Sequence, residues 1–300
     1  MRLHRSRAAV ALAGLGLLAT LPSCALMASD GPSAGPAHAV PTPAPGPLSG
    51  SVPRPHHLVL VMFENERASE IIGSRDAPYI NSLSHGGATF TESFGVAHPS
   101  QPNYITLFSG SAQGVHDDSC GPTFGADNQA HQLIAAGFSF RSYAEGLPAP
   151  GSKVCASGRY ARKHAPWTNF TNVPASAQLP FTSFPRDYSK LPDVSWVIPD
   201  LCHDMHDCSV ASGDSWLKAE LGGYARWAKD HSSLLVVTFD EDDYSGDNRI
   251  ATIFYGGDVR PGRYDEHITH LNVLATIESM YGLPRLGGAR SVNAISDVWK

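Results

Sequence analysis

Three short polar strings stand out because each follows or interrupts an apolar run. Glu64-Asn65 follows HLVLVMF, Ser100 lies inside HPSQPNY, and Asp240-Glu241 follows SLLVVTF. The two apolar runs predict buried strands, and side chains just beyond the carboxyl ends of strands form the ligand site of an open α/β sheet. Carboxylate, carboxamide and hydroxyl oxygens gathered there indicate a hydrolytic site built around a metal ion and a serine.

Ser100 is the candidate nucleophile. Pro99 and Pro102 bracket it just before an apolar-periodic stretch, which predicts a helix that begins near this serine. A serine in that position is most often only a helix cap. A helix N-terminus also favours anions, so its backbone donors and the Asn103 carboxamide could hold phosphoryl oxygens while the Ser100 hydroxyl attacks phosphorus.

The acidic strings supply what the serine lacks, because a serine hydroxyl needs a base or a metal to become a good nucleophile. Together with Ser100 they offer only oxygen donors, at Glu64, Asn65, Asp240 and Glu241. Such a set suits Ca²⁺, Mg²⁺ or Mn²⁺ better than Zn²⁺. Either acidic pair alone could be a solvated turn or a helix cap, but two after strongly apolar runs favour one divalent metal ion.

The segment DLCHDMHDCS places two histidines and two aspartates between two cysteines. It could be a zinc knuckle that uses Cys202, His203, His206 and Cys208. A disulfide between Cys202 and Cys208 is preferred, because export favours oxidation and four ligands within seven residues would struggle to surround one ion. His206 would then be free to give a proton to the leaving oxygen and later to take one from water.

A basic cluster could meet a negatively charged ester. It lies in GRYARKHAPW and contains Arg159, Arg162, Lys163 and His164. Most short basic runs are solvated surface, so the two arginines are left out of the site. His270, which opens the last predicted helix, is a further candidate, and a capping or core role is equally open for it.

The N-terminus predicts export. Basic MRLHRSR precedes the apolar run AAVALAGLGLLATL, which is typical of a secretory signal over residues 1–28. Cys24 in LPSC resembles a bacterial lipoprotein processing site, although the proline is atypical there and a soluble secreted form stays open. Residues 29–55 are rich in Pro, Ala and Gly and are expected to be a linker, which leaves residues 56–300 as one catalytic domain.

Five cysteines leave one unpaired. If Cys24 is lipidated or removed, four remain, and sequence alone allows three pairings among them. Proximity in the chain favours Cys120 with Cys155 and Cys202 with Cys208.

Apolar strands alternate with amphipathic helices along this domain. Strands are predicted over 57–63, 88–95, 138–145, 194–199, 233–239 and 251–256, and helices over 78–87, 100–110, 128–137, 214–230 and 270–282. This alternation predicts an α/β fold with a largely parallel sheet. The net charge of -6 and the pI near 6.1 argue against a nucleic-acid partner, and a monomer is expected.

The motifs together resemble a known family. The ordered set of Glu64-Asn65, HPSQPNY, RKHAPW, DMHD, TFDEDD and THLNVLATIESMYGLP is similar to the bacterial phosphoesterase family of secreted acid phosphatases and phospholipases C. The resemblance runs from about His56 to the C-terminus. It implies an alkaline-phosphatase-like fold, in which a central, mostly parallel sheet lies between helices.

The resemblance also implies an activity, the hydrolysis of phosphate monoesters through a phosphoserine, with a phosphoinositide among the candidate substrates. It implies that the metal is held by Glu64, Asn65, Ser100, Asp240 and Glu241. It also implies that the residues facing the phosphate are Asn103, Lys163, His164 and His206. Asp207 and His270 are added to the substrate-binding residues because they lie within matching motifs. Contact with a membrane is expected only through a lipid anchor or a lipid substrate. The wider superfamily commonly uses two zinc ions held by Asp-His pairs, whereas this chain shows one set of ligands, so one metal ion is expected.

Two other functions stay open. The same site could cleave phosphodiesters as a phospholipase C, because the sequence does not show the width of the pocket. Alternatively, the acidic loops could hold calcium structurally in a non-catalytic surface lipoprotein, which would leave Ser100 as a cap. A sulfatase is disfavoured because the chain lacks the Cys-x-Pro-Arg signature.

Overall fold

The structure is a computed structural model that describes residues 52–300. The predicted signal segment, Cys24 and residues 29–51 of the predicted linker lie outside the described residues. At the start of the described part, Pro55 is buried and Val52 packs against the hydrophobic core.

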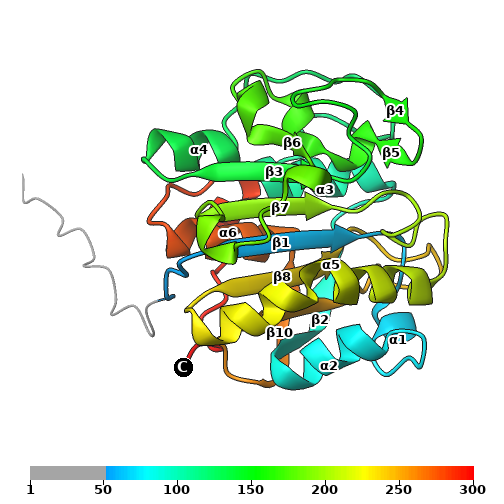
Figure 1. Cartoon of the computed structure of the whole chain (residues 1–300), viewed down its shortest axis with the longest axis vertical. Helices are drawn as coiled ribbons and strands as arrows, with labels where there is room; N and C mark the ends of the chain where they lie inside the picture. The colour runs from blue at the N-terminus through cyan, green and yellow to red at the C-terminus, as the bar shows by residue number, and fades with distance from the viewer. Residues whose placement is uncertain (1–51) are drawn as a thin grey trace, which may run out of the picture. The chain divides into compact units, whose positions relative to one another are not determined.

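An eight-stranded sheet runs through the centre of the domain in the order β10-β2-β9-β8-β1-β7-β3-β6 (Figure 1). Its strands are β1 (Leu58–Phe63), β2 (Ala88–Phe94), β3 (Phe140–Ala144), β6 (Gln178–Pro180), β7 (Val194–Ile198), β8 (Leu234–Phe239), β9 (Thr252–Gly256) and β10 (Gly262–Thr269). Only β9 is antiparallel to its neighbours within this sheet. The predicted α/β fold with a largely parallel sheet is therefore confirmed.

Helices cover both faces of the sheet, with α2 and α5 on one side and α3, α4 and α6 on the other (Figure 1). The α-helices are α1 (Ala68–Ile71), α2 (Pro78–Gly86), α3 (Ser100–Ser109), α4 (Gln129–Ala135), α5 (Val210–Asp230) and α6 (His270–Met280). Short 3-10 turns occupy Arg162–His164, Pro166–Asn169, Ala175–Ala177, Phe181–Ser183, Tyr188–Lys190 and Gly287–Ser291. Among residues 52–300, no helix combines the length and the apolar character that crossing a bilayer requires.

Some elements were not predicted. β10 was missed because its sequence, GRYDEHIT, is mostly polar and its side chains are largely exposed or half-buried at the edge of the sheet. The hairpin of β4 (Ala156–Ser157) and β5 (Tyr160–Ala161) is too short to give a periodic signal. Helix α5 begins four residues before the predicted range, because its first turn, VASG, consists mostly of small residues that show no apolar stripe.

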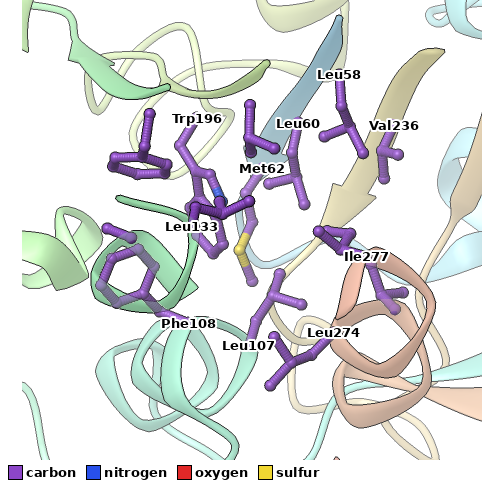
Figure 2. Close-up of a cluster of buried hydrophobic side chains, with 14 of the residues drawn as sticks. Leu58, Leu60, Met62, Leu107, Phe108, Leu133, Trp196, Val236, Leu274 and Ile277 are labelled. Carbon is purple, nitrogen blue, oxygen red and sulfur yellow. The ribbon is translucent and has the colours of Figure 1, made fainter. Parts of the chain in front are cut away.

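The core explains why β1 reads as a continuous apolar run. All six of its residues are buried. Leu58, Leu60 and Met62 face α3 and α6, as Figure 2 shows, whereas Val59, Val61 and Phe63 belong to the cluster beneath α2 and α5. Burying each such side chain is worth about 2 kcal/mol, so the end of this strand is firmly held.

The register of the central strands decides where the functional side chains meet. β1 pairs with β8 in parallel, and Phe63 lies opposite Phe239. The next residues, Glu64 and Asp240, therefore leave the sheet side by side, and the Asp240 amide donates to the Phe63 carbonyl at 3.0 Å. This edge of the sheet holds the candidate site.

Helix α3 depends on a glycine at its C-terminus. Gly110 has φ +74°, and a Cβ there would lie 2.4 Å from the Leu286 carbonyl oxygen. We expect Gly110→Ala to lower the free energy of unfolding by about 3 kcal/mol or more, because it adds a backbone clash to left-handed strain. The matched control, Gly114→Ala, has φ +78° and open space around it, and should cost only about 1 kcal/mol. Urea unfolding of the full chain measures both; equal losses would contradict the close approach.

Candidate active site

Ser100 meets two carboxylates at the carboxyl edge of the sheet. Its hydroxyl oxygen lies 2.8 Å from Glu64 Oε2 and 3.2 Å from Glu241 Oε1. The three residues come from the end of β1, the start of α3 and the end of β8, and all are buried. Pro99 occupies the N-cap of α3 and makes no capping hydrogen bond, and the Ser100 hydroxyl points to carboxylates, so Ser100 is not acting as the helix cap.

The carboxylates beside Ser100 repel one another in a buried place. Burial raises the pKa of Asp240 to about 7. Burial and the charge of Asp240 raise the pKa of Glu241 to about 8, and burial with the charges of Asp240 and Asp204 raises that of Glu64 well above its usual value. A site that collects negative charge in this way favours a cation.

Glu64 is oriented by groups on its far side. Its Oε1 accepts a short hydrogen bond from the Tyr104 hydroxyl and lies 3.3 Å from His164 Nε2, which leaves Oε2 for Ser100. The Tyr104 and His164 rings stack with centroids 5.1 Å apart. Tyr104 was not predicted, although it lies four residues after Ser100 in HPSQPNY and therefore on the same helix face.

His164 lies behind Glu64 and does not reach the surface. Its Nδ1 is 3.1 Å from Asp204 Oδ2, and the ring is buried. Burial, together with the nearby Lys163 charge, lowers the pKa of His164 well below its usual value, and burial raises that of Asp204 to about 8. The Glu64 amide also donates to the Asp204 carbonyl at 2.8 Å, so this pair ties the 200–208 loop to the end of β1.

The acidic residues that follow β8 have different partners. Glu241 Oε2 lies 2.7 Å from His98 Nδ1; this contact was not predicted, although His98 stands two residues before Ser100. Asp242 instead accepts backbone N–H bonds from Tyr244, Gly246 and Asn248 at 2.9, 3.1 and 3.0 Å. Its buried carboxylate therefore shapes the 242–248 loop.

A hollow of about 310 Å³ opens above Ser100. It is lined by Asn65, Pro99, Ser100, Asp118, Lys163, His206, Glu241, Asp243 and Tyr244. Lys163 Nζ lies 2.8 Å from Asp118 Oδ2 and 3.3 Å from His206 Nε2. Burial lowers the pKa of Lys163, but the Asp118 hydrogen bond and the Glu64 charge outweigh it, so the net shift is upward and the ammonium stays charged.

Asp118 is a third site residue that was not predicted. Its Oδ1 accepts from the Gln101 amide in the first turn of α3 at 2.9 Å, while its Oδ2 holds Lys163. The only signal was its place in HDDSC, two residues before Cys120.

Besides His164, three further predicted substrate contacts lie outside the lining of the hollow. Asn103 Oδ1 accepts from the Val96 and Ala97 amides at 2.9 and 3.0 Å, so its carboxamide fixes the loop before Ser100. Asp207 Oδ1 lies 2.7 Å from His206 Nδ1 and orients that ring. His270 is buried with Nε2 2.7 Å from the Asp240 carbonyl, and burial lowers its pKa to about 4.

Both predicted disulfides are present, between Cys120 and Cys155 and between Cys202 and Cys208. The second excludes the zinc-knuckle alternative, because its sulfurs are bonded to each other. It closes the loop that carries His206. Arg162, which was left out of the predicted site, is buried and donates to Lys153, Thr168 and Asn169 oxygens.

A further carboxylate and histidine cluster lies at the end of β3 and the start of the 200–208 loop. Potential ligand atoms of Glu145, Asp200 and His203 lie within 4.8 Å of one another. Their polar atoms already pair locally: His203 Nδ1 is 2.9 Å from Glu145 Oε2, and Asp200 Oδ1 accepts from the Cys202 and His203 amides. These contacts stabilise the start of the 200–208 loop.

Known proteins share both the sequence and the fold. A phosphatidylinositol-3-phosphatase from Mycobacterium tuberculosis is 49% identical over 260 residues, which cover 86% of this chain and 87% of that protein. A phosphate-repressible acid phosphatase from Penicillium chrysogenum is 28% identical over 243 residues, covering 73% of this chain and 58% of that protein. A solved structure from Vibrio parahaemolyticus, described as a protein in the alkaline phosphatase superfamily, matches 82% of this chain and 72% of its own with a TM-score of 0.55 at 11% identity, which shows the fold alone.

The phosphoesterase family profile matches residues 72–284, most of the described domain. The resemblance that the motifs indicated is confirmed. The chain therefore belongs to the phosphoesterase family, and it is a phosphoric ester hydrolase with an alkaline-phosphatase-like fold.

Proposed function

We propose that this hydrolase cleaves phosphate monoesters through a phosphoserine formed on Ser100, with the help of one divalent cation. The observation that carries the proposal is the position of the Ser100 hydroxyl, 2.8 Å from Glu64 Oε2 and 3.2 Å from Glu241 Oε1, beside a hollow open to substrate. A hydroxyl held by carboxylates has an acceptor for its proton, which a nucleophilic serine needs.

Two unsatisfied oxygens support a cation site. Among the described residues, Asp240 Oδ2 and Asn65 Oδ1 are buried and accept no hydrogen bond. A buried acceptor without a partner is costly, and an ion among Glu64, Asn65, Asp240 and Glu241 would satisfy both atoms. The donors are oxygens, which supports Ca²⁺, Mg²⁺ or Mn²⁺ over Zn²⁺. When bound, such an ion lowers the pKa of the serine hydroxyl and offsets charge on the phosphate.

The residues of the hollow supply the remaining chemistry. The Lys163 ammonium attracts the phosphate dianion and fixes its orientation for in-line attack by Ser100. His206 Nε2 lies 3.3 Å from Lys163 Nζ, which can only donate, while Asp207 fixes Nδ1. When Lys163 turns to the phosphate, Nε2 is free to bind a proton and to give it to the departing alcohol. The same nitrogen then takes a proton from the water that hydrolyses the phosphoserine and releases inorganic phosphate.

The names of the relatives and the sequence bear on the substrate class and the location. The Mycobacterium tuberculosis relative is named a phosphatidylinositol-3-phosphatase, and the fungal relative an acid phosphatase, which supports a monoester such as a phosphoinositide. The two disulfides and the predicted signal segment at the N-terminus support export, either in soluble form or anchored through Cys24.

The serine can be tested directly. Ser100→Ala should lower kcat for p-nitrophenyl phosphate by at least about a thousandfold, because the attacking atom is lost. The matched control is Ser109→Ala on the same helix, since that buried hydroxyl donates only to backbone carbonyls. Steady-state kinetics on this monoester and on the diester bis(p-nitrophenyl) phosphate also distinguishes a phosphomonoesterase from the alternative, a phosphodiesterase. Retained activity in Ser100→Ala, or a preference for the diester, would contradict the proposal.

Buried carboxylates also predict how pH affects stability. Asp240 ionises near pH 7 when folded but near pH 4 when unfolded. Between these values the folded chain binds more protons, so the contribution of Asp240 to stability falls as pH rises. We expect the melting temperature of the chelated protein to fall as the pH rises from about 5 to about 8. This fall should be less steep in Asp240→Asn. Added Mg²⁺ should raise the melting temperature most at the higher pH.

The control for this experiment is Asp230→Asn, which removes an exposed carboxylate at the end of α5 and should keep the wild-type slope. If the melting temperatures of wild type and Asp240→Asn change with pH in the same way, burial does not raise the pKa of Asp240, and the prediction is wrong.

A further inference from the structure

A second cavity adjoins the hollow. It has a volume of about 340 Å³, within the range of small-molecule sites, and three arginines line it: Arg67, Arg249 and Arg263. They come from the segment after β1, the segment before β9 and the edge strand β10. In a chain with a net charge of -6, such a concentration of guanidinium groups is unusual, and none of these arginines is used by the proposed mechanism.

These guanidinium groups are incompletely paired. Among residues 52–300, Arg263 makes no ion pair or side-chain hydrogen bond, and Arg67 Nε has an ion-pair contact but no hydrogen bond. Arg67 lies 3.5 Å from both Glu70 and Asp243. Arg249 lies 3.2 Å from Glu92 and 3.7 Å from Asp247, with both partners substantially exposed. Donor capacity therefore remains for an anion.

The carboxylates in the cavity wall occupy few of the guanidinium donors. Asp242 and Asp247 are the acidic residues of the lining. The Asp242 oxygens are already taken by three backbone N–H groups of its own loop. Asp247 is 63% exposed and can turn towards water.

The cavity and the hollow share their dividing wall. Asn65 lines the hollow and Arg67 lines the cavity, two residues further along the chain; Asp243 lines the hollow and Asp242 the cavity. Residues two apart have Cα atoms within about 7 Å. The ion pair between Arg67 and Asp243, 3.5 Å long, lies between the cavity and the hollow. Such a pair is weak, so a phosphate can displace Asp243 from Arg67.

We infer that this cavity binds a second phosphate group of the substrate while the scissile phosphate occupies the hollow above Ser100. The inference rests on the proposed function and narrows it to esters that carry a second anionic phosphate, as a phosphoinositide does in its phosphodiester. Arginine suits this role because its planar fork binds phosphate oxygens in pairs.

The test compares two soluble substrates that share one scissile phosphate. Inositol 3-phosphate has only that group, whereas glycerophosphoinositol 3-phosphate adds a phosphodiester. Phosphate release by the full chain gives the ratio of their kcat/KM values. Arg263→Gln and Arg249→Gln should each lower this ratio by about tenfold, the effect of one lost charge-assisted hydrogen bond. The matched control is Arg186→Gln, whose exposed side chain pairs with Glu220 away from the cavity.

The outcomes separate the two claims. If wild type hydrolyses neither substrate, the proposed function fails, and this inference fails with it. If wild type hydrolyses both and the ratio is the same in all four proteins, only the second phosphate site is overturned. An unchanged ratio together with an Arg263-dependent site for inorganic phosphate in calorimetry would assign the cavity to a free anion, which also overturns its role in binding substrate.

Discussion

The dominant constraint in this molecule is the cost of holding three carboxylates together out of water. Glu64, Asp240 and Glu241 converge because two adjacent parallel strands end in register and the chain continues directly from each into acidic residues. Desolvation and mutual repulsion oppose their ionisation. The fold tolerates this arrangement because the strands beneath are buried on both faces. The uncompensated negative charge gives the site its affinity for a cation. The same carboxylates offer an acceptor for the proton of Ser100.

Further layers hold these groups in place. Tyr104 and His164 fix the far side of Glu64, and His98 fixes the far side of Glu241. Asp118 holds both Lys163 and the first turn of α3, and its loop is tied by the Cys120–Cys155 disulfide. Preorganisation of this kind lets a short, flexible group such as a serine hydroxyl present one orientation to substrate.

Much of the site could be predicted from the sequence because its members follow strongly apolar runs. Glu64, Asp240 and Ser100 stand at element ends, and that position brought them together. The roles of Asn103 and His270 could not be predicted in the same way, because whether a polar side chain faces a hollow or a backbone carbonyl depends on loop packing. Asp118 lies in a loop without periodicity, and β10 is a polar edge strand, so neither gave a local signal.

The most direct test of the central claim is anomalous diffraction from crystals of the full chain grown with Mn²⁺. The account predicts one strong peak among the side-chain oxygens of Glu64, Asn65, Asp240 and Glu241, next to the Ser100 hydroxyl. Absence of a peak there at saturating Mn²⁺, or a peak only at the cluster of Glu145, Asp200 and His203, would contradict it.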